Sequence, residues 1–156
     1  MSMPPPAEAP RIGVLVICHG GLGQALLETV AMLVGPPAKA WAVGLMPGEG
    51  VEDLEANVRA ALGRLDPGDG ALCLVDIPGG VPARVAGALT VGTARAVETV
   101  SGVNLPMLAE VMLRRDDADL AALAELAARA GRDGVVDLGA ALRAAAARAS
   151  ARSSRA

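Results

Sequence analysis

The sequence predicts an α/β domain with a doubly wound, mostly parallel sheet and helices on both faces of the sheet. From residue 11 to residue 138, apolar runs of strand length alternate with segments whose apolar residues recur at helical spacing. The run at 71–76 is apolar almost throughout, as is typical of a parallel strand buried on both faces. A chain of 156 residues can bury one such core and is too short for two ordinary domains.

The first half of this segment alternates regularly between expected strands and helices. Gly35-Pro36-Pro37 ends the first helix, and the cluster at 66–70 is a predicted turn. The expected elements, in chain order, are a strand at 12–17, a helix at 22–34, a strand at 40–45, a helix at 51–65, a strand at 71–76, and a short helix that opens at 79–82 and ends near Gly92.

The pattern is weaker in the second half. We expect a strand at about 94–100, followed by a helix at 105–115. Asn104 is the predicted N-cap of that helix, and Pro106 fits its first turn.

The last part of the domain is predicted to contain one more helix and one more strand. Asp116 or Asp117 is the predicted cap of the helix, and Gly131 is its predicted end. Residues 135–138 then form an expected short edge strand. The domain is therefore expected to cover residues 11–138.

The two ends of the chain fall outside this domain. Residues 1–10 are rich in proline and are predicted to be a disordered lead-in, with neither the basic nor the apolar region of a secretory signal. Residues 139–156 are rich in Ala and Arg and contain no acidic residue. A frayed or disordered helix is the simpler interpretation of this tail, and a partner-binding arm is the alternative.

Composition argues against several classes of function. Phe and Tyr are absent, Trp41 is the only aromatic residue, and the net charge is −3, whereas a nucleic-acid binder needs clustered Lys and Arg and often aromatic stacking platforms. The apolar stretches are shorter than the roughly 20 residues of a membrane helix, so direct membrane insertion is not expected. Cys18 and Cys73 lie inside apolar runs, which favours a reduced, cytoplasmic protein.

His19 and Asp76 are the candidate functional residues. Each stands at the end of an otherwise apolar strand, and open parallel sheets bind ligands beyond the carboxyl ends of their strands. After each of them the chain turns through glycines, Gly20 and Gly79–Gly80, into a helix N-terminus that favours an anion. These glycines also let a large partner approach the imidazole of His19, the only histidine in the chain.

Two interpretations of this pair remain open. In the first, Asp76 accepts a hydrogen bond from Nδ1–H of His19, which leaves Nε2 free as a nucleophile. In the second, His19 is a hydrogen-bonded structural residue, and Asp76 is a turn or capping carboxylate.

Other chemistries fit the sequence less well. Zinc needs three or four ligands, and His19, Cys18 and Asp76 are a poor set because neighbouring strand residues point to opposite faces. The same alternation argues against a Cys18–His19 dyad. A serine triad lacks its G-x-S-x-G turn, and the glycines match no complete nucleotide-binding pattern. We therefore expect no metal and no cofactor.

Five ordered blocks between Arg11 and about Leu138 carry a family resemblance. They are Val14-Leu15-Val16-Ile17-Cys18-His19-Gly20 with Leu26-Leu27-Glu28-Thr29; Pro47-Gly48-Glu49; Leu74-Val75-Asp76 with Gly79-Gly80 and Pro82; Ser101-Gly102-Val103-Asn104-Leu105-Pro106-Met107-Leu108; and Gly131-Arg132-Asp133-Gly134-Val135. Together they resemble the mannose/fructose-type enzyme IIA component of the bacterial phosphoenolpyruvate-dependent sugar phosphotransferase system. The first block resembles the phosphohistidine segment of that family.

The resemblance implies a phosphotransferase component, a phosphohistidine carrier. It implies that Nε2 of His19 accepts a phosphoryl group from phospho-HPr and passes it to a IIB protein, with Asp76 as the carboxylate partner of the histidine. Such a transfer needs neither metal nor nucleotide. The resemblance also implies a doubly wound domain that is usually a homodimer, often with a C-terminal strand exchanged between subunits.

Two positions in the expected phosphoryl-binding loops depart from the family pattern, which usually reads Gly-Gly-Ser/Thr-Pro with an Asn two residues after the proline. Val81 replaces the hydroxyl residue, and Arg84 stands at the Asn position. The hydroxyl is expected near the phosphoryl group, so Val81 predicts altered transfer. Arg84 either compensates by binding phosphoryl oxygens or is a solvated surface residue.

Two further functions remain open at this stage. One is a stand-alone regulatory module whose phosphorylation at His19 controls binding to a target protein. The other is a non-catalytic sensor that binds a small anion at the same glycine loops. The resemblance implies no sugar-binding residue in this chain, because sugar contacts belong to the membrane components of such systems.

Overall fold

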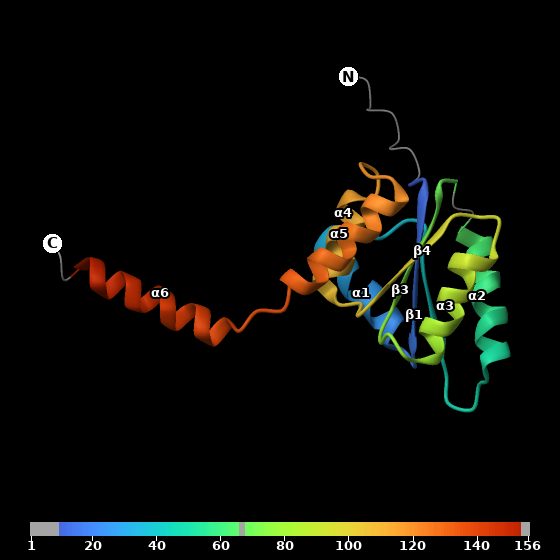
Figure 1. Cartoon of the computed structure of the whole chain (residues 1–156), viewed down its shortest axis with the longest axis horizontal. Helices are drawn as coiled ribbons and strands as arrows, with labels where there is room; N and C mark the ends of the chain where they lie inside the picture. The colour runs from blue at the N-terminus through green and yellow to red at the C-terminus, as the bar shows by residue number, and fades with distance from the viewer. Residues whose placement is uncertain (1–9, 66–67, 154–156) are drawn as a thin grey trace, which may run out of the picture.

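The computed structural model describes residues 10–65 and 68–153, and Figure 1 shows a sheet that lies between layers of helices. All strands of the sheet run parallel, in the order β2-β1-β3-β4. They are β1 (Ile12–His19), β2 (Ala40–Leu45), β3 (Gly70–Val75) and β4 (Val97–Ser101). The predicted α/β class is confirmed, and the carboxyl ends of the strands meet at one edge of the sheet.

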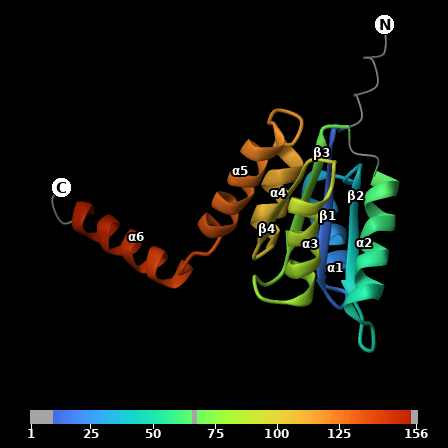
Figure 2. The ribbon, with the colours of Figure 1, turned by 45° about the vertical axis from the view of Figure 1, so that its right-hand side comes forward.

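Helices cover both faces of this sheet, as Figure 2 shows. One face is covered by α2 (Val51–Leu65) and α3 (Val81–Gly92). The other face is covered by α1 (Leu22–Val34), α4 (Leu105–Arg114) and α5 (Leu120–Asp133). This is the doubly wound arrangement that the sequence predicts.

The apolar core has two parts, one on each face, and β1 contributes to both. Leu15 and Ile17 pack toward α2 and α3, while Val14 and Val16 pack toward α1, α4 and α5. All four side chains are fully buried. Burial of an aliphatic side chain of this kind stabilises a fold by roughly 1.5–3 kcal/mol, so β1 is the well-packed centre from which the site projects.

The observed strand limits place the two candidate residues. β1 extends beyond the expected end at residue 17 and includes His19, while β3 ends at Val75, so that Asp76 is the first residue after it. The fourth strand begins at Val97, later than the sequence predicts. Both candidate residues therefore lie at the carboxyl edge, on neighbouring strands.

One helix cap is predicted correctly and one is not. Asn104 caps α4 by accepting a hydrogen bond of 2.9 Å from a first-turn N–H. The cap of α5 is Asp119, whose Oδ1 accepts from Ala122 N–H at 2.8 Å, rather than Asp116 or Asp117. The reason is that residues 115–118 form the turn that leaves α4, so the next helix starts later.

The predicted end of α5 at Gly131 is also wrong, because the helix continues to Asp133. Gly131 serves helix packing instead. A Cβ at this position would lie 2.6 Å from Cε of Met107 on α4, and the carbonyl of Gly131 accepts a hydrogen bond of 2.9 Å from Nδ2 of Asn104. The glycine therefore lets α5 approach α4 closely.

The prediction of a short strand at 135–138 is wrong as well. Residues 135–137 have no regular structure, and α6 (Leu138–Ser153) begins where the strand was expected to end. Asp137 accepts a hydrogen bond of 2.9 Å from Ala140 N–H at the start of this helix. Within the described chain no strand pairs with this segment, so its ladder hydrogen bonds would have no partner. Strand exchange between subunits stays a prediction.

Helix α6 stands away from the sheet in Figures 1 and 2, and all of its residues are exposed. The described part of the predicted tail is thus helical. Residues 1–9 of the expected lead-in, residues 66–67 of the expected turn and residues 154–156 lie outside the described residues. In the ranges that are described, every helix is too short or too polar to cross a bilayer.

Candidate functional site

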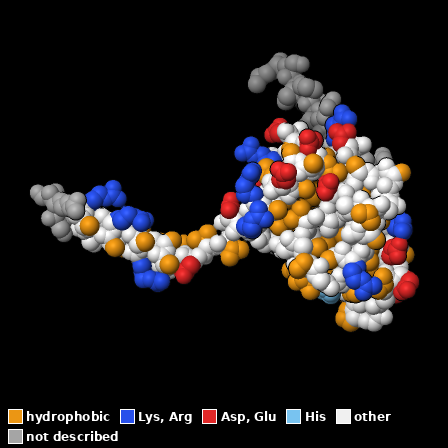
Figure 3. Space-filling view, in the orientation of Figure 1, with side chains coloured by type: hydrophobic (Ala, Val, Ile, Leu, Met, Phe, Trp, Pro, Cys, Tyr) orange, Lys and Arg blue, Asp and Glu red, His pale blue; other side chains and the backbone are white. Residues whose placement is uncertain are grey.

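The structure brings His19 and Asp76 together at the carboxyl edge of the sheet. Oδ2 of Asp76 lies 2.8 Å from Nδ1 of the His19 ring, and it also accepts a hydrogen bond of 2.7 Å from the His19 backbone N–H. Oδ1 accepts a hydrogen bond of 2.9 Å from the Ile77 N–H. Both carboxylate oxygens are therefore held in place. Figure 3 shows the imidazole of this single histidine, in pale blue, at the surface.

These contacts fix the charge of Asp76, whose side chain is only 11% exposed. Burial raises the pKa of the carboxyl group, but hydrogen bonds from the His19 backbone, the His19 ring and the Ile77 N–H outweigh burial. The pKa of Asp76 consequently lies below its ordinary value. An ionised carboxylate only accepts hydrogen bonds, so the proton between the two side chains belongs to Nδ1 of His19.

The same hydrogen bond determines which nitrogen of His19 can react. With the proton on Nδ1, Nε2 of the neutral ring carries the lone pair. The His19 side chain is 45% exposed, and its Nδ1 side faces the nearly buried Asp76. The exposed part of the ring is therefore the Nε2 side, where a partner can approach.

Gly80 lies against the edge of the imidazole. A Cβ at Gly80 would lie 2.7 Å from Cε1 and 3.3 Å from Nε2 of His19. The backbone of Gly80 is extended, with φ −82° and ψ 173°, a conformation that any residue adopts. Glycine is therefore needed here for space rather than for backbone freedom. At the neighbouring Gly79, a Cβ would meet no atom within 4 Å.

A second close approach shapes the turn that follows His19. Gly20 has a φ of +57°, which favours glycine, and its N–H donates to the carbonyl of Leu45 at 2.9 Å. Gly44, on the neighbouring β2, lies so close that a Cβ there would overlap the carbonyl oxygen of Gly20. Gly44 is not among the site residues predicted from the sequence, although a glycine inside a strand is a signal of close backbone approach.

Two helix N-termini lie at this edge of the sheet. The N-cap residues are Gly21 for α1 and Gly80 for α3, and neither helix has a side-chain hydrogen bond at its cap. The first N–H groups of each helix thus lack a side-chain acceptor, and the positive end of each helix dipole is near His19. An anion beside Nε2 would be stabilised by both.

The other predicted loop residues make no hydrogen bond with the His19–Asp76 pair. Val81 is half-buried and packs against the core on the α3 side. Arg84 is exposed on the first turn of α3, and its guanidinium forms no hydrogen bond or ion pair with any residue that the structure describes. Its side chain is thus available to a ligand.

The surroundings of the pair favour neither a metal nor a thiol reaction. The described part of the chain contains no group of three or more His, Cys, Asp or Glu side chains that could hold a metal ion. Cys18 packs into the core on the α1 side, and burial, together with the charge of Asp76, raises the pKa of its thiol to about 12. A thiol with such a pKa stays protonated at neutral pH and is a poor nucleophile.

Comparison with known sequences gives consistent matches. The family described as PTS system fructose IIA component matches residues 13–128. The chain is 37% identical over 125 residues to the PTS system mannose-specific EIIAB component of Escherichia coli (strain K12), which covers 80% of this chain but only 38% of that relative. It is 34% identical over 105 residues to the PTS system fructose-specific EIIA component of Bacillus subtilis (strain 168), which covers 67% of this chain and 71% of that relative.

Solved structures with similar folds agree with these matches. The phosphotransferase system component EIIA from Streptococcus agalactiae superposes with a TM-score of 0.76 at 23% identity, covering 83% of this chain and 98% of that one. The mannose/sorbose specific IIA subunit from Enterococcus faecalis superposes with a TM-score of 0.73 at 25% identity, covering 82% and 95%.

Substitution of Gly80 tests the packing around the imidazole. In Gly80→Ala, we expect the new Cβ to displace the His19 ring, which weakens its hydrogen bond to Asp76 and mixes the two tautomers. The nitrogen chemical shifts of the single imidazole measure this mixture. Gly79→Ala is the matched control and leaves the shifts unchanged, because its Cβ would have open space. Identical shifts in both variants would contradict the packing argument.

Proposed function

The chain belongs to the family of PTS system fructose IIA components, and from this membership we propose that it is a phosphohistidine carrier of the sugar phosphotransferase system. Nε2 of His19 accepts a phosphoryl group from phospho-HPr and passes it to a IIB protein. The observation that supports this role most directly is the hydrogen bond between Nδ1 of His19 and Asp76. It leaves the reactive lone pair on the exposed side of the ring.

The proposed transfer exchanges one nitrogen–phosphorus bond for another. The lone pair of Nε2 attacks the phosphorus, the new bond forms, and the nitrogen of the donor histidine leaves with its bonding pair. The proton on Nδ1 stays where it is. Positive charge that develops on the imidazole is stabilised by the ionised Asp76, so no proton transfer is required.

The phosphoryl oxygens are the second centre of charge in this reaction. The N-termini of α1 and α3 supply N–H groups and positive dipole ends at the same edge of the sheet. Gly80 leaves space beside Nε2, because a Cβ at this position would lie 3.3 Å from that nitrogen. We place the reaction in the cytoplasm, where the free, buried Cys18 and Cys73 stay reduced.

Phosphorylation with purified components tests the proposal. Incubation with enzyme I, HPr and phosphoenolpyruvate should place one acid-labile phosphate on each chain, and addition of a IIB protein should remove it. The variant His19→Ala should take up no label while it keeps the circular dichroism spectrum of the parent. Label retained in that variant, or found on Ser or Thr, would exclude His19 as the carrier.

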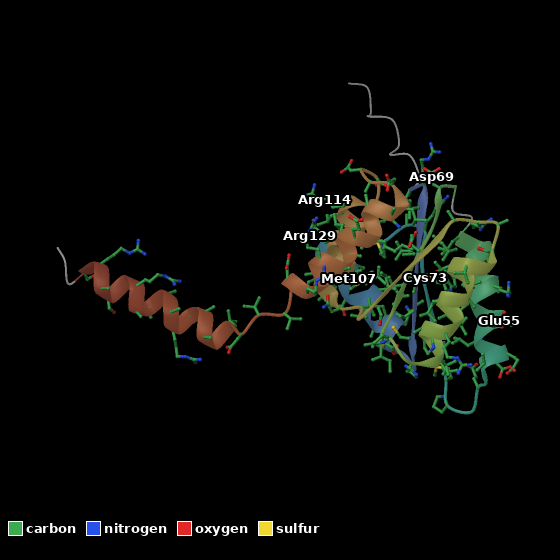
Figure 4. The ribbon with its side chains drawn as sticks, in the orientation of Figure 1. Glu55, Asp69, Cys73, Met107, Arg114 and Arg129 are labelled. Carbon is green, nitrogen blue, oxygen red and sulfur yellow. The ribbon has the colours of Figure 1, made fainter. Side chains whose placement is uncertain are left out.

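Asp76→Ala should slow the phosphorylation of His19. Loss of the acceptor frees the ring and mixes the tautomers, and a charge-assisted hydrogen bond is worth roughly 1.5–3 kcal/mol, which corresponds to about tenfold to over a hundredfold in rate. Single-turnover transfer from phospho-HPr measures this loss. The control is Asp69→Ala, since Asp69 pairs with Arg11 at the opposite edge of the sheet and is labelled in Figure 4. Equal rates in the two variants would make Asp76 a structural residue only.

We propose that Arg84 donates hydrogen bonds to the phosphoryl group, which Val81 cannot do because it has no hydroxyl. Its free guanidinium on the first turn of α3 can donate two hydrogen bonds to phosphoryl oxygens. Arg84→Ala should then shorten the lifetime of phospho-His19 and shift the transfer equilibrium toward HPr, by up to about fivefold for an exposed pair. Hydrolysis and equilibrium measurements on the labelled chain give both quantities.

A double variant and a remote variant sharpen this test. Val81→Ser combined with Arg84→Asn restores the family pattern and should recover transfer. Arg129→Ala removes the same charge from α5, on the other face of the sheet, where Figure 4 labels it, and should change neither quantity. If Arg84→Ala behaves like Arg129→Ala, then Arg84 is a solvated surface residue.

A further inference from the structure

Helix α6 is exposed along its whole length, and none of its residues is buried. Figures 1 and 2 show that it extends away from the sheet and from the helices that cover the sheet. It also lies beyond residues 13–128, the part of the chain that the family match covers. The surface of α6 is therefore open to a partner, and the family match does not assign that partner.

The charge of the chain divides at the start of this helix. Residues 138–156 contain four of the 14 Lys and Arg and none of the 17 Asp and Glu, so this segment carries a charge of +4 and residues 1–137 carry −7. Arg143, Arg148 and Arg152 are exposed, and none of them forms a hydrogen bond or an ion pair with a residue that the structure describes. The helix is thus complementary to an anionic partner, whereas the domain repels one.

Large apolar side chains accompany these arginines. Leu138 and Leu142 belong to α6, and Val135 and Val136 lie just before it. All four side chains are between 61% and 78% exposed. Four large apolar side chains within eight residues form an exposed apolar surface, which typically marks a site of interaction.

The helix places its apolar and basic side chains on different sides. At about 100° per residue, Ala145 and Ala149 continue the stripe that the two leucines begin. Arg143 lies to one side of this stripe, and Arg148 and Arg152 lie to the other. Figure 3 shows blue side chains projecting from both sides of this helix. The stripe can therefore face an apolar phase while arginines on both sides reach a charged boundary.

The combination of arginines and exposed apolar side chains selects among anionic partners. Nucleic acid would neutralise the arginines but would leave the leucines and valines in water, and α6 has no aromatic side chain on which bases could stack. An anionic lipid surface accommodates both kinds of side chain. Its headgroups attract the arginines, and the boundary between headgroups and acyl chains takes up the apolar side chains.

We propose that α6, together with Val135 and Val136, binds the surface of a membrane that contains anionic lipid. The helix lies in the plane of the surface, with the leucine stripe toward the acyl chains, and it does not span the bilayer. Alanine occupies much of the remaining helix surface, so the arginines provide most of the attraction and the apolar side chains add to it. The acidic domain stays in water. The inference does not rest on the proposed function, because lipid binding requires no phosphoryl transfer.

Flotation of the full chain with lipid vesicles tests the inference. The chain should bind vesicles of mixed phosphatidylglycerol and phosphatidylcholine, and it should not bind vesicles of phosphatidylcholine alone. High salt should release it from the anionic vesicles, because salt screens the arginines. Absence of binding to the anionic vesicles at low salt would overturn the inference. The assay involves no phosphorylation of His19, so such a result would leave the carrier function untouched.

Substitution of the helix arginines tests the electrostatic contribution. Each Arg near an anionic surface strengthens binding roughly fivefold, so replacement of all three by Gln should weaken binding about a hundredfold. Glutamine is a good helix former, and the circular dichroism spectrum should stay unchanged. The control makes the same change in net charge on α4 and α5, at Arg114, Arg129 and Arg132, and should weaken binding far less. Equal losses in the two triple variants would reflect net charge alone and would contradict binding through α6.

Substitution of the leucines separates lipid from other partners. The double variant Leu138→Ala, Leu142→Ala keeps every charge and should weaken binding to the anionic vesicles about tenfold or more, because each leucine loses three apolar carbons. Leu113→Ala, at a similarly exposed leucine of α4, should not weaken it. Unchanged vesicle binding of the double variant, or equally tight binding of the parent to duplex DNA, would make α6 a general polyanion site and overturn the lipid assignment. Leucine-dependent self-association in light scattering, without vesicle binding, would assign the stripe to a second copy and overturn it as well.

Discussion

The carboxylate of Asp76 is the constraint on which the whole site depends. It accepts hydrogen bonds from the ring and the backbone of His19 and from the N–H of Ile77, so one side chain ties together the ends of β1 and β3. A nearly buried carboxylate without these donors would cost several kcal/mol of desolvation. The bonds that stabilise the charge are the same bonds that place the proton on Nδ1. The stability of the fold and the tautomer of His19 are therefore linked through the pairing of two neighbouring parallel strands, in which Ile17 is in register with Val75.

Close packing around His19 is the second constraint, and it requires glycines, which have no side chain. Gly80 admits the imidazole edge, and Gly44 admits the carbonyl of Gly20. The two glycines act on opposite sides of His19, because one follows β3 and the other lies in β2. Their roles differ from that of Gly20, whose positive φ demands a flexible backbone. The imidazole ring is thus positioned by the hydrogen bond on its Nδ1 side and by close backbone packing around it.

Sequence patterns predicted the fold well where local and tertiary preferences coincide. Buried runs such as 12–17 and 71–76 become strands, and the Asn104 cap forms as expected. The errors occur where a residue serves a distant contact. Gly131 looks like a helix end but packs against Met107, and residues 135–138 look like a strand that no neighbouring strand pairs with. For the site, strand ends and glycines indicated His19, Asp76 and Gly80. Gly44 carries a weaker signal, a glycine inside a strand, and the backbone that approaches it belongs to Gly20 in the turn after the neighbouring strand.

The residues at the carboxyl edge of the sheet divide into a fixed pair, His19 and Asp76, and exposed side chains around it. The first seven residues of β1 are buried and His19, the eighth, is exposed, so the imidazole is held on a fixed support. Leu22, Met46 and Ile77 surround it but contact solvent over about half of their surface. Substitutions at these positions would change the exposed apolar surface without disturbing the hydrogen bond to Asp76. Val81 and Arg84, where the family pattern changes, also lie outside that hydrogen bond. A substitution around the pair would therefore leave this hydrogen bond in place, whereas a substitution of Asp76 would remove it.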